Sequence, residues 1–333
     1  MTQTRRSFVT GLAGGFVMSA LPLHAKSAPL PLTLALQDGG TASWELAAMQ
    51  ALGLDQAAGL DISVRPVADS RAGQVALQTG AADVILSDFL WTSIQRHKGA
   101  GFTIVPHSLA VGGLLVHPDS GISALTDLVG QTIAVAGGPV DKSYVILQAL
   151  FRQETGLSLP DVATLRFGAP PLVRELLVGG HVPAALNFWH FNARAAAQGM
   201  VELLSVKDML AALGVSRTPP LLGWVFSDTF AAANPETIRR YLDASFATKV
   251  QLMVNDPLWE DLRPLMNVGA DNAMFIALRD AYRAGIVQSY GAEDIAAATQ
   301  TFAIMAAVGG AELVGDHATL ADGTFWSGYQ VAG

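Results

Sequence analysis

Two short stretches hold the residues best suited to chemistry, and each follows an apolar run of strand length. Residues 187–190 read Asn187-Phe-Trp-His190 and bring an amide, an indole and an imidazole together. Residues 136–143 read Ala136-Gly-Gly-Pro-Val-Asp-Lys142-Ser143 and bring an ammonium group and a hydroxyl together. Such groups bind a solute by stacking and hydrogen bonding, and an imidazole can also act as a general acid or base. The sequence therefore raises both binding and catalysis as functions.

No catalytic or metal-binding motif accompanies these residues. The stretch before Lys142 resembles a phosphate loop, but Ala136 replaces its first glycine and Asp141 precedes the lysine, so the nucleotide cradle is missing. The chain has no cysteine, and its seven histidines show no ligand spacing. The motifs of serine hydrolases, zinc proteases and dinucleotide-binding folds are also absent. We therefore expect a binding protein and not an enzyme, although side chains distant in sequence could still converge.

Lys142 and Ser143 fall in the first turn of a predicted helix, a good position for a carboxylate, sulfonate or phosphate group. The alternative is a solvent-exposed lysine paired with Asp141. Arg71 begins another predicted helix and could add charge to the same site, or it could simply lie on the surface.

Short apolar runs alternate with helical patterns along the first half of the chain. The runs at 32–36, 61–67, 83–86, 102–105 and 132–135 predict strands, and the segments between most of them predict helices. This alternation indicates βαβ units and mostly parallel sheets covered by helices on both faces. After Thr218-Pro219-Pro220 the pattern changes to long helices with few strands.

In open α/β sheets, ligands bind beyond the carboxyl ends of the strands. The segments predicted at those ends are Gly39–Trp44, Ser87–Trp91, Gly137–Ser143 and Asn187–His190. They contain Trp44, Trp91 and Trp189, three of the six tryptophans. Each tryptophan alone is more simply explained as core, but together they favour a slot that stacks on a flat or apolar ligand.

A weak internal repeat suggests two lobes built on one plan. Residues 77–87 and 177–187 both end a helix, turn at a glycine, continue into a short apolar strand and finish on a polar residue. The alternative is chance similarity between two helix-to-strand turns.

Composition excludes several classes of protein. Hydrophobic side chains make up 51% of the 333 residues and charged ones 14%, so the chain can bury one large or two medium cores and disorder is not expected. The formal charge is −8 and basic residues form no stripe, so nucleic acid is a poor candidate partner.

The first 25 residues predict export. Arg5 and Arg6 precede Phe8 and an uncharged stretch, which ends in the cleavage-like pattern Leu23-His24-Ala25. Adjacent arginines are typical of twin-arginine signals. We predict that residues 1–25 are an export signal and that the mature protein is periplasmic. An uncleaved membrane anchor is the alternative.

Together with this signal, the order of four motifs resembles a known family. The motifs are Gly59-Leu-Asp61-Ile-Ser-Val64, Val75–Asp88, Asp127–Val135 and Ala185–Trp189. They resemble the solute-binding proteins of ABC transporters in the nitrate, sulfonate, taurine and thiamine-precursor group. Each motif is weak alone, and the resemblance extends from about Leu32 to Met253.

The resemblance implies an α/β, two-lobe periplasmic-binding-protein fold of type II, in which each lobe is a mostly parallel sheet flanked by helices and a ligand cleft lies between the lobes. We place lobe 1 at residues 30–112 and 219–333, and lobe 2 at residues 113–218. Carried over position by position, the family's ligand contacts fall on Gly40, Thr41, Trp44, Ser87, Trp91, Lys142, Ser143, Asn187 and Trp189. Arg71 and His190 complete the predicted ligand-binding set.

The resemblance also implies that a monomer captures a small aromatic or anionic solute by lobe closure and delivers it to an ABC permease and ATPase, with no required cofactor. Candidate solutes are a sulfonate, a pyrimidine precursor of thiamine and pyrroloquinoline quinone. Pyrroloquinoline quinone is a candidate because two motifs resemble those of a subgroup associated with quinoprotein dehydrogenases. The motifs are Asn187-Phe-Trp-His190 and Gly168-Ala-Pro-Pro171. The related pyrimidine synthases depend on a cysteine-rich motif, which this chain lacks. A periplasmic enzyme and a ligand-sensing protein remain the alternatives.

Overall fold

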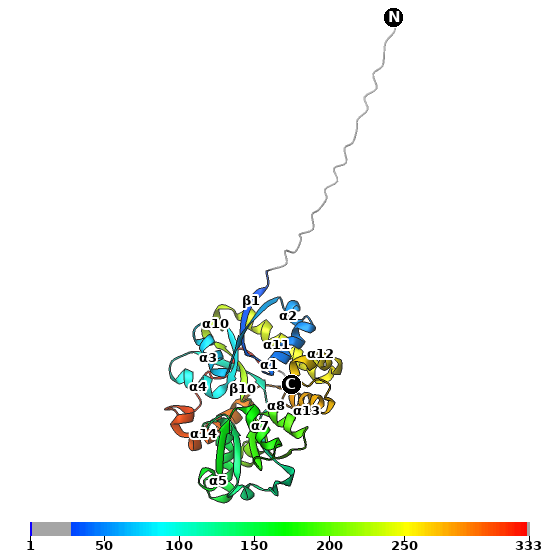
Figure 1. The fold of residues 1–333 in the computed structure, drawn as a ribbon. Helices are drawn as coiled ribbons and strands as arrows, with labels where there is room; N and C mark the ends of the chain where they lie inside the picture. The colour runs from blue at the N-terminus through cyan, green and yellow to red at the C-terminus, as the bar shows by residue number, and fades with distance from the viewer. Residues whose placement is uncertain (2–27, 332–333) are drawn as a thin grey trace.

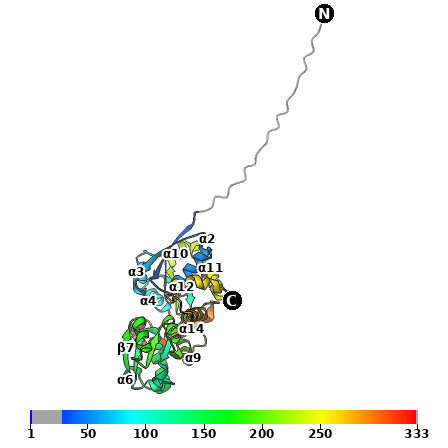
Figure 2. The same cartoon turned by 45° about the vertical axis from the view of Figure 1, so that its right-hand side comes forward.

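The computed structural model describes Met1 and residues 28–331, which form two α/β lobes (Figures 1 and 2). Each lobe contains a five-stranded sheet flanked by helices. This confirms the predicted two-lobe α/β fold. Apart from Met1, the predicted export signal lies outside the described residues.

The sheet of lobe 1 has the strand order β2-β1-β3-β10-β4. Its strands are β1 (Leu30–Gln37), β2 (Leu60–Val67), β3 (Val84–Asp88), β4 (Phe102–Ser108) and β10 (Leu222–Ser227). Strand β1 runs parallel to β2 and β3, whereas β10 runs antiparallel to β3 and β4. The sheet of lobe 2 has the order β7-β6-β8-β5-β9. Its strands are β5 (Gly113–Val116), β6 (Thr132–Ala136), β7 (Thr164–Gly168), β8 (Ala184–Asn187) and β9 (Val201–Ser205).

The two sheets follow one plan, and both are mixed where we predicted mostly parallel pairing. The first strand after each crossing from one lobe to the other is β5 in lobe 2 and β10 in lobe 1. Each of these strands runs antiparallel to both of its neighbours. The parallel strands of both lobes end at the cleft. Strands β5 and β10 begin at the cleft, because the chain crosses between the lobes there, so they run in the opposite direction. The two copies of the internal repeat end in β3 and β8, which hold equivalent places in the two orders.

Helices cover both sheets. Those of the first half of lobe 1 are α1 (Ala42–Ala51), α2 (Leu54–Ala57), α3 (Ser70–Gln78) and α4 (Phe89–His97). Lobe 2 carries α5 (Lys142–Thr155), α6 (Leu159–Val162), α7 (Pro170–Val178), α8 (Trp189–Ala196), α9 (Val206–Ala212) and the short helices η1 (Pro118–Ser120) and η2 (Leu125–Leu128). The C-terminal part adds α10 (Asp228–Ala233), α11 (Pro235–Val254), α12 (Asp256–Met266), α13 (Asn272–Ala284) and α14 (Ala292–Val314).

The C-terminal helices contact both lobes. Helix α13 packs against α8 of lobe 2, and α14 packs against α5 of lobe 2 and α4 of lobe 1. Residues 219–333, which we assigned to lobe 1, therefore also join the two lobes. Among the described residues, α14 is the one helix long and apolar enough to cross a membrane. Its Phe302 and Met305 are buried in the core, and core helices of soluble proteins share this composition.

An ionic network lies buried in lobe 1, where α1, α11 and α13 meet β4. Lys249 donates to Glu45, with 2.7 Å between Nζ and Oε2, and also to the hydroxyl of Ser245. Ser245 and Tyr282 donate to the same carboxylate. Burial by itself raises the pKa of Glu45, but Lys249 and His107 lower it below its ordinary value overall. The carboxylate is therefore ionised, and it is fully buried among donors from α11 and α13.

Candidate functional site

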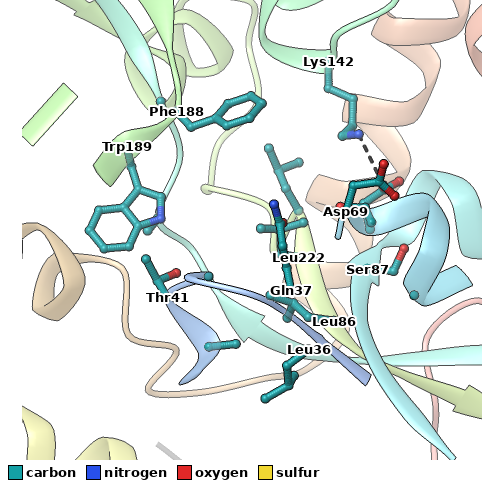
Figure 3. Close-up of a pocket in the computed structure, with 18 of the residues that line it drawn as sticks. Leu36, Gln37, Thr41, Asp69, Leu86, Ser87, Lys142, Phe188, Trp189 and Leu222 are labelled. Carbon is teal, nitrogen blue, oxygen red and sulfur yellow. Dashed lines mark hydrogen bonds and ion pairs between the residues drawn. The ribbon is translucent and has the colours of Figure 1, made fainter. Parts of the chain in front are cut away.

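A cavity of about 260 Å³ lies between the lobes (Figure 3). Lobe 1 lines it with Ala35, Leu36, Gln37, Gly40, Thr41, Ala42, Val67, Asp69, Ser70, Gly73, Leu86, Ser87 and Asp88. Lobe 2 adds Asp141, Lys142, Ser143, Phe188 and Trp189. The two chain crossings add Ala110, Val111, Gly112 and Leu221, and β10 adds Leu222. The cavity therefore sits at the carboxyl ends of β1, β3, β6 and β8, where an open α/β sheet binds its ligands.

Much of the wall is apolar. Leu36, Leu86 and Leu222 lie on one side, and the rings of Phe188 and Trp189 reach in from lobe 2 (Figure 3). Trp189 also packs edge-on against Trp44 of lobe 1, with 6.1 Å between ring centroids. An apolar wall with a few polar groups is typical of a small-molecule pocket.

Aspartates cap three helices that begin at the cavity. Asp69 accepts from the N–H of Ala72 in α3, and Asp88 accepts from that of Trp91 in α4, each at 2.8 Å. Asp141 accepts from the N–H groups of Ser143 and Tyr144 in α5. These carboxylates occupy the positions at which a helix N-terminus would otherwise hold an anion.

One ion pair crosses the cavity from lobe to lobe. Lys142 Nζ of α5 lies 3.2 Å from Asp88 Oδ2 at the end of β3 (Figure 3). Asp88 raises the pKa of Lys142 above its ordinary value even though burial lowers it. The lysine therefore stays protonated and is paired with Asp88, whereas the alternative interpretation of the sequence paired it with Asp141.

Six of the predicted ligand-binding residues line the cavity, from all four of the predicted strand ends. They are Gly40, Thr41, Ser87, Lys142, Ser143 and Trp189. Ser87 is held in place by Gln74, whose amide donates to its hydroxyl at 3.1 Å. Their contact with a ligand stays a prediction.

Three other predicted residues lie elsewhere in lobe 1. Trp44 is buried in the core beside Trp259 and Tyr282, because α12 and α13 cover the side of α1 from which it projects. Trp91 stacks on Phe102 at 5.4 Å within the lobe. Arg71 is exposed and does not line the cavity.

The remaining two predicted residues flank the cavity in lobe 2. Asn187 is buried, and its amide donates to Pro170 O and accepts from the N–H of Phe188, which secures the turn into α8. His190 turns away from the cavity and packs against Phe191, since successive helical residues point about 100° apart. Phe188, which we did not predict, lines the cavity in their place.

Sequence reasoning also missed the three aspartates as cavity residues. Each precedes a helical segment in the capping position, so their positions at the starts of α3, α4 and α5 could have been inferred from the sequence. That the three aspartates converge on one cavity could not be inferred from the sequence.

The family model described as NMT1/THI5 like matches residues 46–258, which is more than half of the chain. The chain belongs to the NMT1/THI5-like family. This confirms the family resemblance inferred from the sequence motifs. A comparison with curated protein sequences finds no significant match.

Solved structures share the NMT1/THI5-like fold. The periplasmic aliphatic sulphonate binding protein SsuA from Escherichia coli is 19% identical, with a TM-score of 0.69, and the match covers 90% of this chain and 98% of that one. The alkanesulfonate-binding protein SsuA from Xanthomonas axonopodis pv. citri, bound to MOPS, is 18% identical over 90% and 99% of the two chains, with a TM-score of 0.68. The desulfurization enzyme DSZB is 14% identical over 89% and 97%, with a TM-score of 0.61. At these identities the likeness shows the fold alone.

His190→Phe should make the stability of this protein less sensitive to acid. Burial, with a smaller effect of Arg194, lowers the pKa of His190 to about 4, whereas an unfolded histidine titrates near 6.5. The native state therefore binds fewer protons than the unfolded state between these pH values. Wild-type stability falls by about 1.4 kcal/mol per pH unit from this residue as the pH drops from about 6.5 to about 4.

Urea unfolding at pH 8, 6 and 5 measures this effect. The variant should match the wild type at pH 8, because phenylalanine keeps the contact with Phe191, and should lose less stability at pH 5. Equal losses in both proteins at pH 5 would show that His190 is protonated in the native state.

Proposed function

We propose that this protein is the periplasmic solute-binding component of an ABC importer and that it encloses a small solute between its lobes. The observation that carries this proposal is a cavity lined by both lobes, with its apolar wall and its polar groups at the carboxyl ends of the strands. The two chain crossings, at residues 109–112 and 213–221, act as hinges. Solute bound to both lobes favours the closed form, because the open form offers only half of the contacts.

The remaining parts of the proposal follow from this role. A soluble binding protein works outside the inner membrane, so the mature chain would be periplasmic. It would act as a monomer and dock on a permease and its ATPase. The names of the two sulfonate-binding neighbours support a binding role.

A binding role suits the cavity better than catalysis. Among the described residues, the lining includes no histidine, and no cluster of three or more His, Asp or Glu could hold a metal ion. Lys142 stays protonated in its pair with Asp88 and is a poor base, so the hydroxyls of Ser87 and Ser143 have no activating partner of that kind. The enzyme DSZB shares the fold, but fold alone does not assign an activity.

Pyrroloquinoline quinone does not fit the residues of the cavity. The lining carries three aspartates and one lysine, which already pairs with Asp88, whereas the quinone carries three carboxylates. Arg71, which we expected to help, does not reach the cavity. The apolar wall suits a smaller ring or alkyl group.

A thermal-shift screen of the mature protein against sulfonates, pyrimidines, nitrate, quinones and small amines tests the proposal. A solute present at 100 times its Kd should stabilise the protein by about 2.7 kcal/mol. The absence of any shift across these classes would refute a binding role.

Trp189→Ala should weaken the solute found in that screen by more than about 1 kcal/mol, or about fivefold in Kd, because its indole forms part of the cavity wall. Isothermal titration of both proteins measures the change. Trp91→Ala serves as a control, since Trp91 packs on Phe102 away from the cavity. Equal affinity in the Trp189 variant would place the solute elsewhere.

A further inference from the structure

The charged side chains of the cavity are mainly acceptors of hydrogen bonds. Asp69, Asp88 and Asp141 line it, and Lys142 is the one basic residue among the described lining residues. Lys142 pairs directly with Asp88, and among the described residues neither Asp69 nor Asp141 forms an ion pair of its own. An anion here would meet a net negative charge from the lining side chains, whereas an ammonium group would be attracted.

Unused acceptor atoms support the same conclusion. Asp69 and Asp141 each cap a helix through Oδ1, and within the described part of the chain neither Oδ2 atom takes part in a hydrogen bond. Burial raises the pKa of Asp141 above its ordinary value despite its lysine neighbour and its two N–H partners. Asp69 is exposed and Asp141 is half-buried, so both carboxylates can accept hydrogen bonds from a solute in the cavity.

The opposite end of the cavity has a different character. Helices α1 and α8 also begin there, next to Thr41 and Trp189, and no side chain caps either of them (Figure 3). Their N–H groups can meet an acceptor or a ring of the solute. The acidic end is therefore the part that discriminates between solutes by charge.

We propose that the enclosed solute carries a protonated amine, or a similar group with several hydrogen-bond donors, and places it against Asp69 and Asp141 at the acidic end of the cavity. This inference rests on the proposed function. A simple anion would find the three helix starts at the acidic end already capped by aspartate.

Matched pairs of probes test this charge preference. Thermal shifts of the mature protein are measured with phenethylamine against hydrocinnamate, benzylamine against phenylacetate, and benzenesulfonate. We expect stabilisation by the amines and none by the acids. Stabilisation by the acids alone would overturn the inference and leave the binding role intact. No stabilisation by any of these probes or by any solute of the wider screen would overturn both.

Two variants assign the effect to the aspartates. Asparagine caps a helix about as well as aspartate, so Asp69→Asn and Asp141→Asn remove a charge and keep the cap. Each should weaken the amine by about tenfold or more, as loss of a charge-assisted hydrogen bond does. Asp271→Asn is the matched control, because Asp271 caps α13 away from the cavity. Unchanged amine affinity in both cavity variants would overturn the assignment.

Discussion

Lys249→Met should lower the free energy of unfolding by about 3–5 kcal/mol, the cost of leaving a buried charge without its partner. Glu45 and Lys249 are 0% and 2% exposed, and 2.7 Å separates their charged atoms. Methionine has a similar length and fills the same space, so the loss comes from the charge and not from a cavity. The carboxylate would keep its bonds from Ser245 and Tyr282 but would lose its ion pair with Lys249.

Chemical unfolding of three variants separates this charge effect from packing. The double variant Glu45→Gln/Lys249→Met should lose less stability than Lys249→Met alone, because the neutral amide does not need the ammonium group. Lys98→Met, at an exposed position, should change the free energy of unfolding by less than about 0.5 kcal/mol. A cost for Lys249→Met no larger than that of Lys98→Met would mean that the pair is hydrated in solution.

Gly73→Phe should abolish solute binding, with at least a hundredfold increase in Kd, while the fold stays intact. Gly73 lies in α3 and lines the cavity. A Cβ atom there would meet only Val67 Cγ2, at 3.8 Å, and the backbone has no positive φ that would disfavour a side chain. A phenyl ring therefore has room to enter the cavity and takes the place of the solute.

Gly73→Ala is the matched control. Alanine adds one methyl group, so binding should persist, and the helix should become more stable by about 0.5–1 kcal/mol because glycine is a poor helix former. Titration of both variants with the solute from the thermal-shift screen measures their Kd values. If Gly73→Phe binds that solute as tightly as the wild type, the solute occupies another site.

The ends of the strands at the cleft could be predicted from sequence patterns. Apolar runs and glycine turns predicted where β1, β3, β6 and β8 finish, because burial on both faces selects continuous apolar residues. The general rule for open α/β sheets then placed Thr41, Ser87 and Lys142 at the cleft. Local capping patterns also mark the positions of Asp88 and Asp141, although their importance was missed.

The tryptophans show the limit of that reasoning. Trp44 and Trp189 both follow strand ends, yet only Trp189 lines the cavity. Helices more than 200 residues further along the chain cover Trp44, as the bond from its indole N–H to Leu265 O shows. Which face of α1 is covered depends on how α12 and α13 pack, and no local pattern encodes that contact.

Sequence alone determined the α/β class and the segments that meet at the cleft, since these depend on burial patterns and turn residues that act over short distances. The family and its two-lobe architecture were inferred from the resemblance of its motifs. The tertiary structure decided the charge of the cavity. Asp88 and Lys142 lie 54 positions apart and belong to different lobes, but they form one ion pair across the cleft. Among the described residues Asp69 and Asp141 form no ion pair, because electrostatic pairing depends on distances in space, which only the packing of the two lobes sets.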